Sequence, residues 1–234
     1  MAYLVPDEKI NWFPHPSLAP ENGHLAVTHT LNEDRVLLAY HYGIFPWEAH
    51  GFPRLWHWFS PDPRCLLLPE DFKPGRYLKA AIKNKEFEIR VDTAYEEVMR
   101  ACSTIPRPDS HGESWIEEDM IEVYTKLHRR GYAHSFESWQ DGELVGGLYG
   151  LSLGRAFFGE SMFHTVNEAS RVALSALIDF CLQNQFHFID CQMETPHMLK
   201  LGARSYPRPE YMAKLAKALH APTIQINWGK LSHY

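Results

Sequence analysis

The order of the sequence patterns predicts an α+β fold with a mixed sheet. From Phe87 onward, short alternating apolar runs typical of strands are interleaved with longer runs in which apolar residues recur at helical spacing. Asp141-Gly142 stands between two alternating runs, a pattern typical of a hairpin that joins antiparallel strands. An apolar helix over residues 168–183 separates two further strands. Together these patterns favour one mixed sheet flanked by helices.

The start of the chain predicts a small N-terminal domain. A helix begins at an acidic and amide cap near Asn32 and ends at Gly43. Trp56–Phe59 and Arg64–Leu68 have the composition of short strands on either side of a proline-rich turn. We therefore divide the chain at this turn into domains 1–62 and 63–234.

The second domain is predicted to hold the remaining elements. The expected helices cover residues 73–85, 93–101, 117–130, 168–183 and 209–219. The expected strands cover residues 87–91, 133–139, 144–149, 153–158 and 186–191.

The composition is that of an ordinary globular protein, with 45% hydrophobic and 22% charged residues among 234. The net charge of −6 means that any nucleic-acid binding needs a local basic patch. The N-terminus has no signal-peptide pattern, and no apolar run is long enough to span a bilayer. We therefore expect a cytoplasmic protein with no membrane partner.

The cysteines and histidines indicate neither disulfides nor a metal site. The four cysteines form no C-x-x-C pair, so we expect reduced thiols. The 14 histidines include no H-E-x-x-H, and no Cys/His set has zinc-ligand spacing. We expect no metal and no cofactor.

Asp190 and Gln192 are polar residues in an unusually apolar segment. Strand alternation puts Phe188, Asp190 and Gln192 on one face, with Ile189 and Cys191 on the other. A carboxylate here is either paired or chemically employed, because burying an unpaired charge is costly. Asp190 could accept a proton from an amine, with Gln192 holding the amine or a carbonyl. The structural alternative is an Asp that caps a neighbouring backbone group or pairs with an Arg, and the spacing alone favours this alternative.

Glu160 lies in a second apolar strand, with similar alternatives. It could bind a cationic acceptor side chain or the ribose of an adenosine. Otherwise it forms a salt bridge with Arg155 or ends the strand in solvent.

Aromatic, apolar and basic groups supply further candidates, each with a structural alternative. Four aromatics, Trp47, Trp115, Tyr40 and Tyr124, could stack a terminal adenine, although such residues more often fill cores. Both tryptophans are expected at loop positions. An apolar pocket, which could equally be core, would comprise Leu148, Phe157, Met162, Leu174, Leu177 and Ile189. A helix face without acids, either solvated or RNA-binding, carries Arg76, Lys79, Lys83 and Lys85. An acidic group, which is either helix N-terminal charge or an attractor of a basic peptide, comprises Glu113, Glu117, Glu118, Asp119 and Glu122.

Five motifs in order resemble the bacterial leucyl/phenylalanyl-tRNA–protein transferases, and the resemblance runs from Leu25 to Tyr211. The motifs are Gly43-Ile-Phe-Pro-Trp47, Trp58-Phe-Ser-Pro-Asp-Pro-Arg64, His134-Ser-Phe-Glu137, Gly159-Glu-Ser-Met-Phe163 and Ile189-Asp-Cys-Gln192. The chain departs from the family pattern at Thr28-His29, at His41 or Tyr42, and at Leu148. These departures concern the N-terminal loop, some tRNA contacts and the breadth of amino-acid choice.

The resemblance implies an acyl-CoA N-acyltransferase-like (GNAT-like) larger domain and a specific reaction. Leu or Phe, and less readily Met, would pass from aminoacyl-tRNA to the N-terminal Arg or Lys of an acceptor protein, creating an N-terminal degradation signal. The resemblance assigns a proton-accepting role to Asp190 acting with Gln192, and places Glu160 in the active site. It assigns the adenosine end to Trp47 and Trp115, with Ser161 nearby, and the apolar pocket to the aminoacyl side chain. We expect a monomer.

Two other functions compete with this one. A CoA-dependent N-acetyltransferase on the same fold would cradle pyrophosphate with a glycine-rich turn before a helix, but residues 161–167 contain no glycine. A binding module for tRNA or basic N-termini would not need Asp190 or Gln192 for chemistry.

Overall fold

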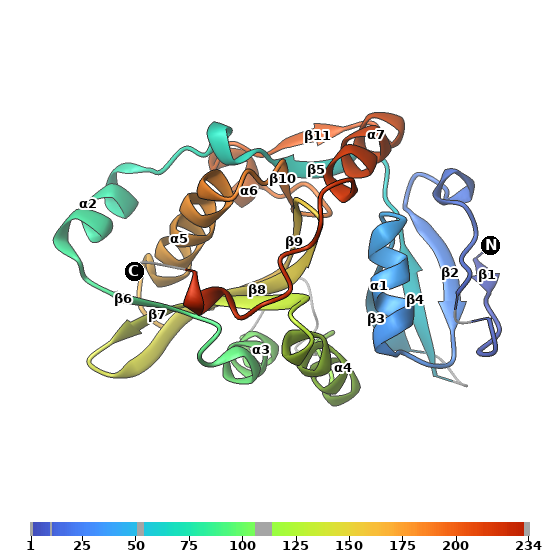
Figure 1. The fold of residues 1–234 in the computed structure, drawn as a ribbon, viewed down its shortest axis with the longest axis horizontal. Helices are drawn as coiled ribbons and strands as arrows, with labels where there is room; N and C mark the ends of the chain where they lie inside the picture. The colour runs from blue at the N-terminus through green and yellow to red at the C-terminus, as the bar shows by residue number, and fades with distance from the viewer. Residues whose placement is uncertain (1, 10, 51–53, 106–113, 232–234) are drawn as a thin grey trace.

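The computed structural model describes residues 2–9, 11–50, 54–105 and 114–231. These residues form two β-sheets, one of four strands and one of seven. In Figure 1 the smaller sheet and helix α1 lie on the right, and the larger sheet with its helices fills the centre and left. The strands of the small sheet all end by Phe59, and those of the large sheet all begin from Arg64. The division into two domains stays a prediction.

The small sheet has the order β1-β2-β4-β3. Its strands are β1 (Tyr3–Leu4), β2 (His24–Thr28), β3 (Phe45–His50) and β4 (Leu55–Phe59). Helix α1 (Glu33–His41) begins as predicted, since the Asn32 side chain accepts a hydrogen bond from the Arg35 N–H at 2.9 Å. The helix is followed by Gly43, whose φ of +69° few other residues adopt. Trp47 lies in β3, so its predicted loop position is wrong.

The large sheet has the order β11-β5-β10-β9-β8-β7-β6. Its strands are β5 (Arg64–Leu67), β6 (Glu88–Val91), β7 (Ala133–Gln140), β8 (Glu143–Leu153), β9 (Ala156–His164), β10 (Phe188–Asp190) and β11 (Arg204–Tyr206). The pair β9–β10 is parallel and the other pairs are antiparallel. A long helix connects the parallel strands, as such a pair requires. The α+β class and the mixed sheet are therefore confirmed.

Helices cover both faces of the large sheet. They are α2 (Arg76–Asn84), α3 (Tyr95–Thr104), α4 (Glu118–Arg129), α5 (Ala169–Gln183), α6 (Pro196–Lys200) and α7 (Arg208–Leu219). Short 3₁₀ turns lie at Pro16–Leu18, Pro69–Asp71 and Trp228–Lys230. One apolar cluster joins α3, α4, α7 and the N-terminal residues on one face, and a second surrounds α5 on the other.

Strand alternation divides the two clusters as the sequence predicts. Phe188 belongs to the first cluster, whereas Ile189 and Cys191 belong to the second. In β9, Phe158 faces the first cluster and Phe157 the second. Asp190 shares the face of Phe188, so the face assigned to this carboxylate is confirmed.

Some boundaries differ from the prediction for local reasons. The strand expected over 153–158 is instead the end of β8 and the start of β9, with a turn at Gly154. Gly154 has a φ of +57°, and an added Cβ would lie 2.3 Å from the Ala218 carbonyl oxygen. Helix α6 and strand β11 were not predicted, because five and three residues are too few to show a period.

Within the described residues, no helix combines the length and apolar character that a membrane crossing requires. The same residues contain no group of three or more His, Cys, Asp or Glu side chains arranged to hold a metal ion. The four cysteines are free thiols, as expected.

Strand β9 contains a bulge at Glu160. Tyr149 pairs with Ser161 and Gly150 pairs with Gly159, which leaves Glu160 as an extra residue. Gly150 allows this arrangement, since an added Cβ would lie 2.1 Å from the Phe158 carbonyl oxygen. Like Phe158 two residues earlier, Glu160 directs its side chain towards the face that carries Asp190, where it meets Tyr40.

We expect Gly150→Ala to lower the free energy of unfolding by about 1–3 kcal/mol, because the methyl group overpacks the bulge. Gly159→Ala is the matched control. Its Cβ would lie 3.7 Å from the nearest atoms, so we expect a change within about 0.5 kcal/mol. Urea denaturation of both variants measures the difference, and equal losses would contradict this account of the bulge.

Candidate active site

A buried ion pair between Arg64 and Asp190 lies at the centre of the candidate site. Arg64 Nε donates to Asp190 Oδ1 at 2.8 Å, and Arg64 Nη2 donates to Oδ2 at 2.9 Å. Both side chains have no exposed surface. The Arg64 guanidinium also lies 4.8 Å from the Phe45 ring centroid and 4.7 Å from that of Tyr211. Asp190 is thus a paired anion, as the structural alternative anticipated.

Two more donors complete the surroundings of Asp190. The Tyr211 hydroxyl donates to Oδ2 at 2.8 Å, and the Gln192 backbone N–H donates to Oδ1 at 2.9 Å. Gln192 adopts a φ of +56°, an uncommon conformation for a residue other than glycine. The bond from its N–H to Asp190 holds this turn in place. Asp190 therefore fixes where the Gln192 side chain lies.

Gln192 and Glu160 meet in space, although 32 residues separate them in sequence. Gln192 Nε2 donates to Glu160 Oε1 at 3.4 Å, and the Tyr40 hydroxyl donates to the same oxygen at 2.5 Å. Arg155 does not pair with Glu160, since its guanidinium donates to the carbonyls of Gly154 and Pro222. Burial, opposed by the Tyr40 hydrogen bond, raises the pKa of Glu160 to about 8.

The parallel strands β9 and β10 part beside these residues. Their register runs from the Phe188–Ala156 pair to the Asp190–Phe158 pair and ends there, while β9 continues along β8. Glu160 and Gln192 each lie two residues beyond the last pair. They flank the place where this pairing stops, which we call the opening between β9 and β10.

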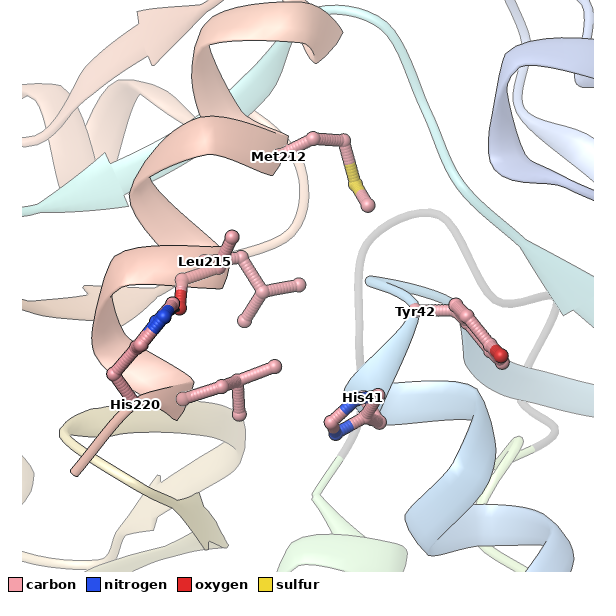
Figure 2. Close-up of a pocket in the computed structure, with 7 residues that line it drawn as sticks. His41, Tyr42, Met212, Leu215 and His220 are labelled. Atoms are coloured by element: carbon pink, nitrogen blue, oxygen red, sulfur yellow. Dashed lines mark hydrogen bonds between the residues drawn. The ribbon is translucent and has the colours of Figure 1, made fainter. Parts of the chain in front are cut away.

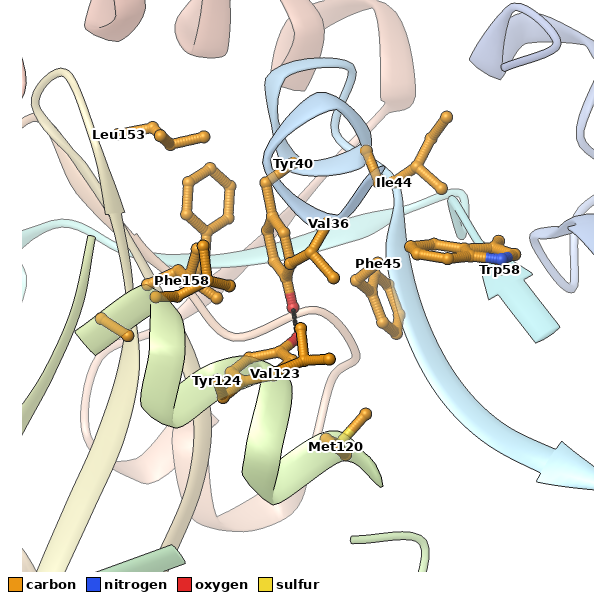
Figure 3. Close-up of a cluster of buried hydrophobic side chains, with 14 of the residues drawn as sticks. Val36, Tyr40, Ile44, Phe45, Trp58, Met120, Val123, Tyr124, Leu153 and Phe158 are labelled. Carbon is orange, nitrogen blue, oxygen red and sulfur yellow. Dashed lines mark hydrogen bonds between the residues drawn. The ribbon is translucent and has the colours of Figure 1, made fainter. Parts of the chain in front are cut away.

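Tyr40 and Tyr124 form a chain of hydroxyl groups that leads to Glu160. The two oxygens lie 2.9 Å apart, as the dashed line in Figure 3 marks. Both rings are fully buried, and Tyr40 packs edge-on against Phe158. Their rings present no face to solvent here, so their part in this arrangement is the hydroxyl chain.

The other residues predicted to bind adenosine are less buried. Trp47 and Trp115 are half-buried and pack at the margin of the first apolar cluster. Trp47 contacts Phe59 edge-on at 5.3 Å between ring centroids. Ser161 is also half-buried and follows Glu160 in the bulge. These three keep exposed surface with which a ligand could make contact.

The six residues of the predicted apolar pocket come together in the cluster around α5. Leu148 lies opposite Met162 in the β8–β9 pair, and Phe157 lies opposite Ile189 in the β9–β10 pair. Met162 is half-buried and the other members are buried. This cluster lies across the sheet from Asp190, and the opening between β9 and β10 is beside it.

The predicted basic face lies on α2, at the far left of Figure 1. Arg76, Lys79, Lys83 and Lys85 are all exposed, and Leu78 and Ala81 attach the helix to Val172 of α5. The predicted acidic group is different. Each of its described members has a basic partner: Arg54 for Glu117 and Asp119, Arg100 for Glu118, and Lys126 for Glu122. Glu113 lies outside the described residues.

Two cavities lie outside this arrangement. One, of about 350 Å³, lies between α1 and α7 and is lined mainly by apolar side chains together with His41, Tyr42 and His220, as Figure 2 shows. The other, of about 170 Å³, lies where α2, α5 and α6 meet. Of the predicted site residues, Arg76 lines the second cavity and none lines the first.

Arg64 and Tyr211 are the site residues that the sequence analysis did not single out. Arg64 belongs to one of the five motifs and opens an apolar strand, where a lone cation needs a carboxylate partner. That signal was available in the sequence. No sequence pattern indicated Tyr211, because its hydroxyl reaches Asp190 only through the packing of α7.

Comparison with known proteins gives consistent matches over nearly the whole chain. Residues 66–216 match the family model described as leucyl/phenylalanyl-tRNA protein transferase. A protein of that name from Desulfatibacillum aliphaticivorans is 48% identical over 93% of this chain and 92% of its own length. Counterparts from Legionella pneumophila strain Lens and Myxococcus xanthus are 49% and 46% identical, covering 93% and 97% of this chain and 96% and 95% of theirs.

Similarity to one solved structure is more distant. A GCN5-related N-acetyltransferase from Kribbella flavida matches with a TM-score of 0.36 at 12% identity, covering 79% of this chain and 65% of that one. Likeness at this level carries no argument about function.

We expect Glu160→Gln to change how stability depends on pH. The pKa of Glu160 is raised from 4.5 to about 8, so the folded protein retains a proton that the unfolded chain releases between these values. The free energy of unfolding therefore falls as pH rises through this window. The glutamine side chain of the variant cannot ionise, so the variant should gain stability relative to wild type as pH rises.

Urea denaturation of both proteins at two pH values measures the effect. The values of about pH 5 and about pH 8.5 span most of this window. A difference between variant and wild type that is the same at both pH values would contradict the raised pKa.

Proposed function

The chain belongs to the leucyl/phenylalanyl-tRNA–protein transferase family of aminoacyltransferases, and we propose that it transfers Leu or Phe, less readily Met, from charged tRNA to the N-terminal Arg or Lys of acceptor proteins. The product would carry a new N-terminal peptide bond and a degradation signal. The observation that carries the proposal is the contact between Glu160 and Gln192 at the opening between β9 and β10. Charged tRNA as donor implies a cytoplasmic enzyme.

The reaction requires three proton transfers: the attacking nitrogen loses two protons, and the leaving ribose oxygen gains one. The acceptor α-amine has a pKa of about 7.7–8.0, so it arrives largely protonated at neutral pH. It must lose a proton before its nitrogen attacks the ester carbonyl carbon. When the bond from that carbon to the ribose oxygen then breaks, the oxygen needs a proton. One group that accepts and then returns a proton satisfies both needs.

Asp190 suits a positioning role in this scheme. Its two oxygens already accept hydrogen bonds from Arg64, Tyr211 and the Gln192 N–H. Protonating it would leave the Arg64 charge without a buried counter-ion, and breaking such a pair costs about 3–5 kcal/mol. We propose that Asp190 assists deprotonation through Gln192, whose side chain it holds at the opening.

Glu160 suits the proton transfer itself. With a pKa of about 8, it changes charge close to the pH at which the α-amine does. Gln192 donates its Nε2–H to Glu160, which leaves its amide oxygen free to accept from the incoming amine. In this scheme the amine proton passes to the Glu160 carboxylate. It returns to the ribose oxygen as the ester bond breaks, which restores Glu160. The attacking nitrogen releases its remaining extra proton to solvent, so that a neutral amide forms.

The opening between β9 and β10 supports one arrangement of the donor. The ester would lie at the opening, with the adenosine against Trp47, Trp115 and Ser161 and the side chain against the apolar cluster around α5. A pocket of Leu148, Phe157, Met162, Leu174, Leu177 and Ile189 would favour an unbranched Cβ, each methylene contributing about 1–3 kcal/mol of discrimination. The basic face of α2 would follow the tRNA backbone.

The first experiment is transfer of radiolabelled leucine from Leu-tRNA to a peptide that begins with Arg. We expect labelling of this peptide and none of the same peptide beginning with Ala. Acetyl-CoA in place of Leu-tRNA should give no acetylated product. No transfer from any charged tRNA by folded protein would refute the proposal, and acetylation would favour the acetyltransferase alternative.

We expect Gln192→Ala to lower kcat/KM by about 100-fold or more, because the amine loses its acceptor and Glu160 loses a donor. Gln192 is half-buried, so unfolding in urea should change little. Gln192 is a cleaner test than Asp190, whose removal would leave Arg64 unpaired.

The matched comparison is the double variant Glu160→Gln/Gln192→Ala. If the two residues act as a unit, the fold-loss of kcat/KM in the double variant should be well below the product of the fold-losses in the two single variants. Multiplicative losses would contradict a shared step.

A further inference from the structure

The second cavity, where α2, α5 and α6 meet, is strongly basic. It has a volume of about 170 Å³, several times the ~30 Å³ that one water occupies in the liquid. Five basic side chains and one acid line it: Lys73, Arg76, Arg171, His197, Lys200 and Glu168. They come from three helices and the segments that precede two of them. The basic character is local, since the whole chain carries a net charge of −6.

The positive charge of this cavity is mostly unneutralised. Glu168 contributes Oε1 to an ion pair with Arg171 at 2.6 Å. In the part of the chain that the structure describes, Lys73, Arg76 and Lys200 lie within ion-pair distance of no carboxylate. Burial and the nearby charge of Arg171 lower the pKa of His197. Repulsive cations gathered round a hollow favour an anionic ligand.

Residues that line the cavity come shortly after the carboxyl ends of both strands that border the opening. Strand β9 ends at His164, and Glu168 comes four residues later. Strand β10 ends at Asp190, and Gln192 leads into α6, which carries His197 and Lys200. Parallel strands deliver ligand-binding groups at their carboxyl ends. A ligand bound here would therefore lie beyond the Glu160–Gln192 contact, on the side of the sheet that α5 covers.

Arg76 links the cavity to the exposed basic face of α2. It lines the cavity and opens the helix, while Lys79 and Lys83 continue along the helix away from it. A polyanion anchored in the cavity could extend along this basic face of α2. Residues 161–167, which precede α5, contain no glycine, so charged side chains rather than a close backbone cradle would make the contact.

We propose that this cavity binds a backbone phosphate of the single-stranded 3′ end of tRNA and so anchors the aminoacyl ester at the opening between β9 and β10. The proposal rests on the proposed function, because it names the part of that substrate which the cavity holds. A CoA pyrophosphate offers the same phosphate chemistry, so the test includes both sources.

The test variant is Lys73→Gln/Lys200→Gln, and the matched control is Lys217→Gln/Lys230→Gln. All four lysines are exposed or nearly so, and the control pair lies outside the cavity. The first probe is an uncharged, fluorescently labelled CCA trinucleotide, whose binding does not depend on catalysis. We expect the test variant to bind it about 10-fold more weakly, and the salt dependence to fall by about 0.7 in log–log slope per lost phosphate contact.

Kinetics separate a phosphate contact from a structural role. With leucyl-CCA as donor, the test variant should raise KM about 10-fold and leave kcat unchanged, whereas 3′-leucyl-adenosine, which lacks a phosphate, should react as with wild type. The control variant should match wild type on both donors. Equal losses on the two donors, or unchanged trinucleotide binding, would overturn the proposal.

Two further outcomes are distinguishable. Displacement of the trinucleotide from wild type, but not from the test variant, by acetyl-CoA at equal concentration would assign the cavity to a nucleotide cofactor and overturn the RNA assignment. Absence of leucyl transfer by wild type would refute the proposed function, while the trinucleotide titration would still report on the cavity by itself.

Discussion

The buried pair between Arg64 and Asp190 is the constraint on which the rest of the site depends. It joins residues 126 positions apart, and neither charge has solvent to compensate it. Such pairs are stabilising only when every remaining donor and acceptor is satisfied. Arg64 gives its third hydrogen bond to the Gly43 carbonyl, and Asp190 takes the Tyr211 hydroxyl and the Gln192 N–H. The pair therefore fixes β5, β10, α7 and the start of β3 relative to one another.

This constraint explains why the two sheets make one site. Tyr40, from the helix of the small sheet, donates to Glu160 in the large one. Arg208 of α7 donates to the carbonyls of Ala19, Pro20 and Ser60. The first apolar cluster takes members from both parts of the chain without a break. A boundary at residues 62–63 separates the sheets, but the proposed site takes residues from both sides of it.

The sequence could predict features that depend on neighbours in the chain. The Asn32 cap, the hairpin at Asp141-Gly142 and the face of Asp190 follow from local spacing, and the structure agrees with each. The bulge at Glu160 depends on how Gly150 and Gly159 pair across two strands, which no local pattern states. The partner of Asp190 depends on long-range packing too. The motifs could indicate which residues matter, whereas the contacts among them came from the fold.

The two carboxylates of the site differ because their surroundings differ. Asp190 faces a permanent cation, so its charged form is the one that leaves no buried charge unpaired. Glu160 faces two tyrosine hydroxyls and an amide, and burial raises its pKa to about 8, with the nearby Asp190 charge adding to the effect. Two carboxyl groups in such different environments commonly have different roles as well. A carboxylate held by a buried guanidinium is suited to position Gln192, and a carboxyl group whose pKa is raised to about 8 is suited to exchange a proton. Arg64 is therefore part of the proposed catalytic arrangement, although nothing in its position requires it to contact a substrate.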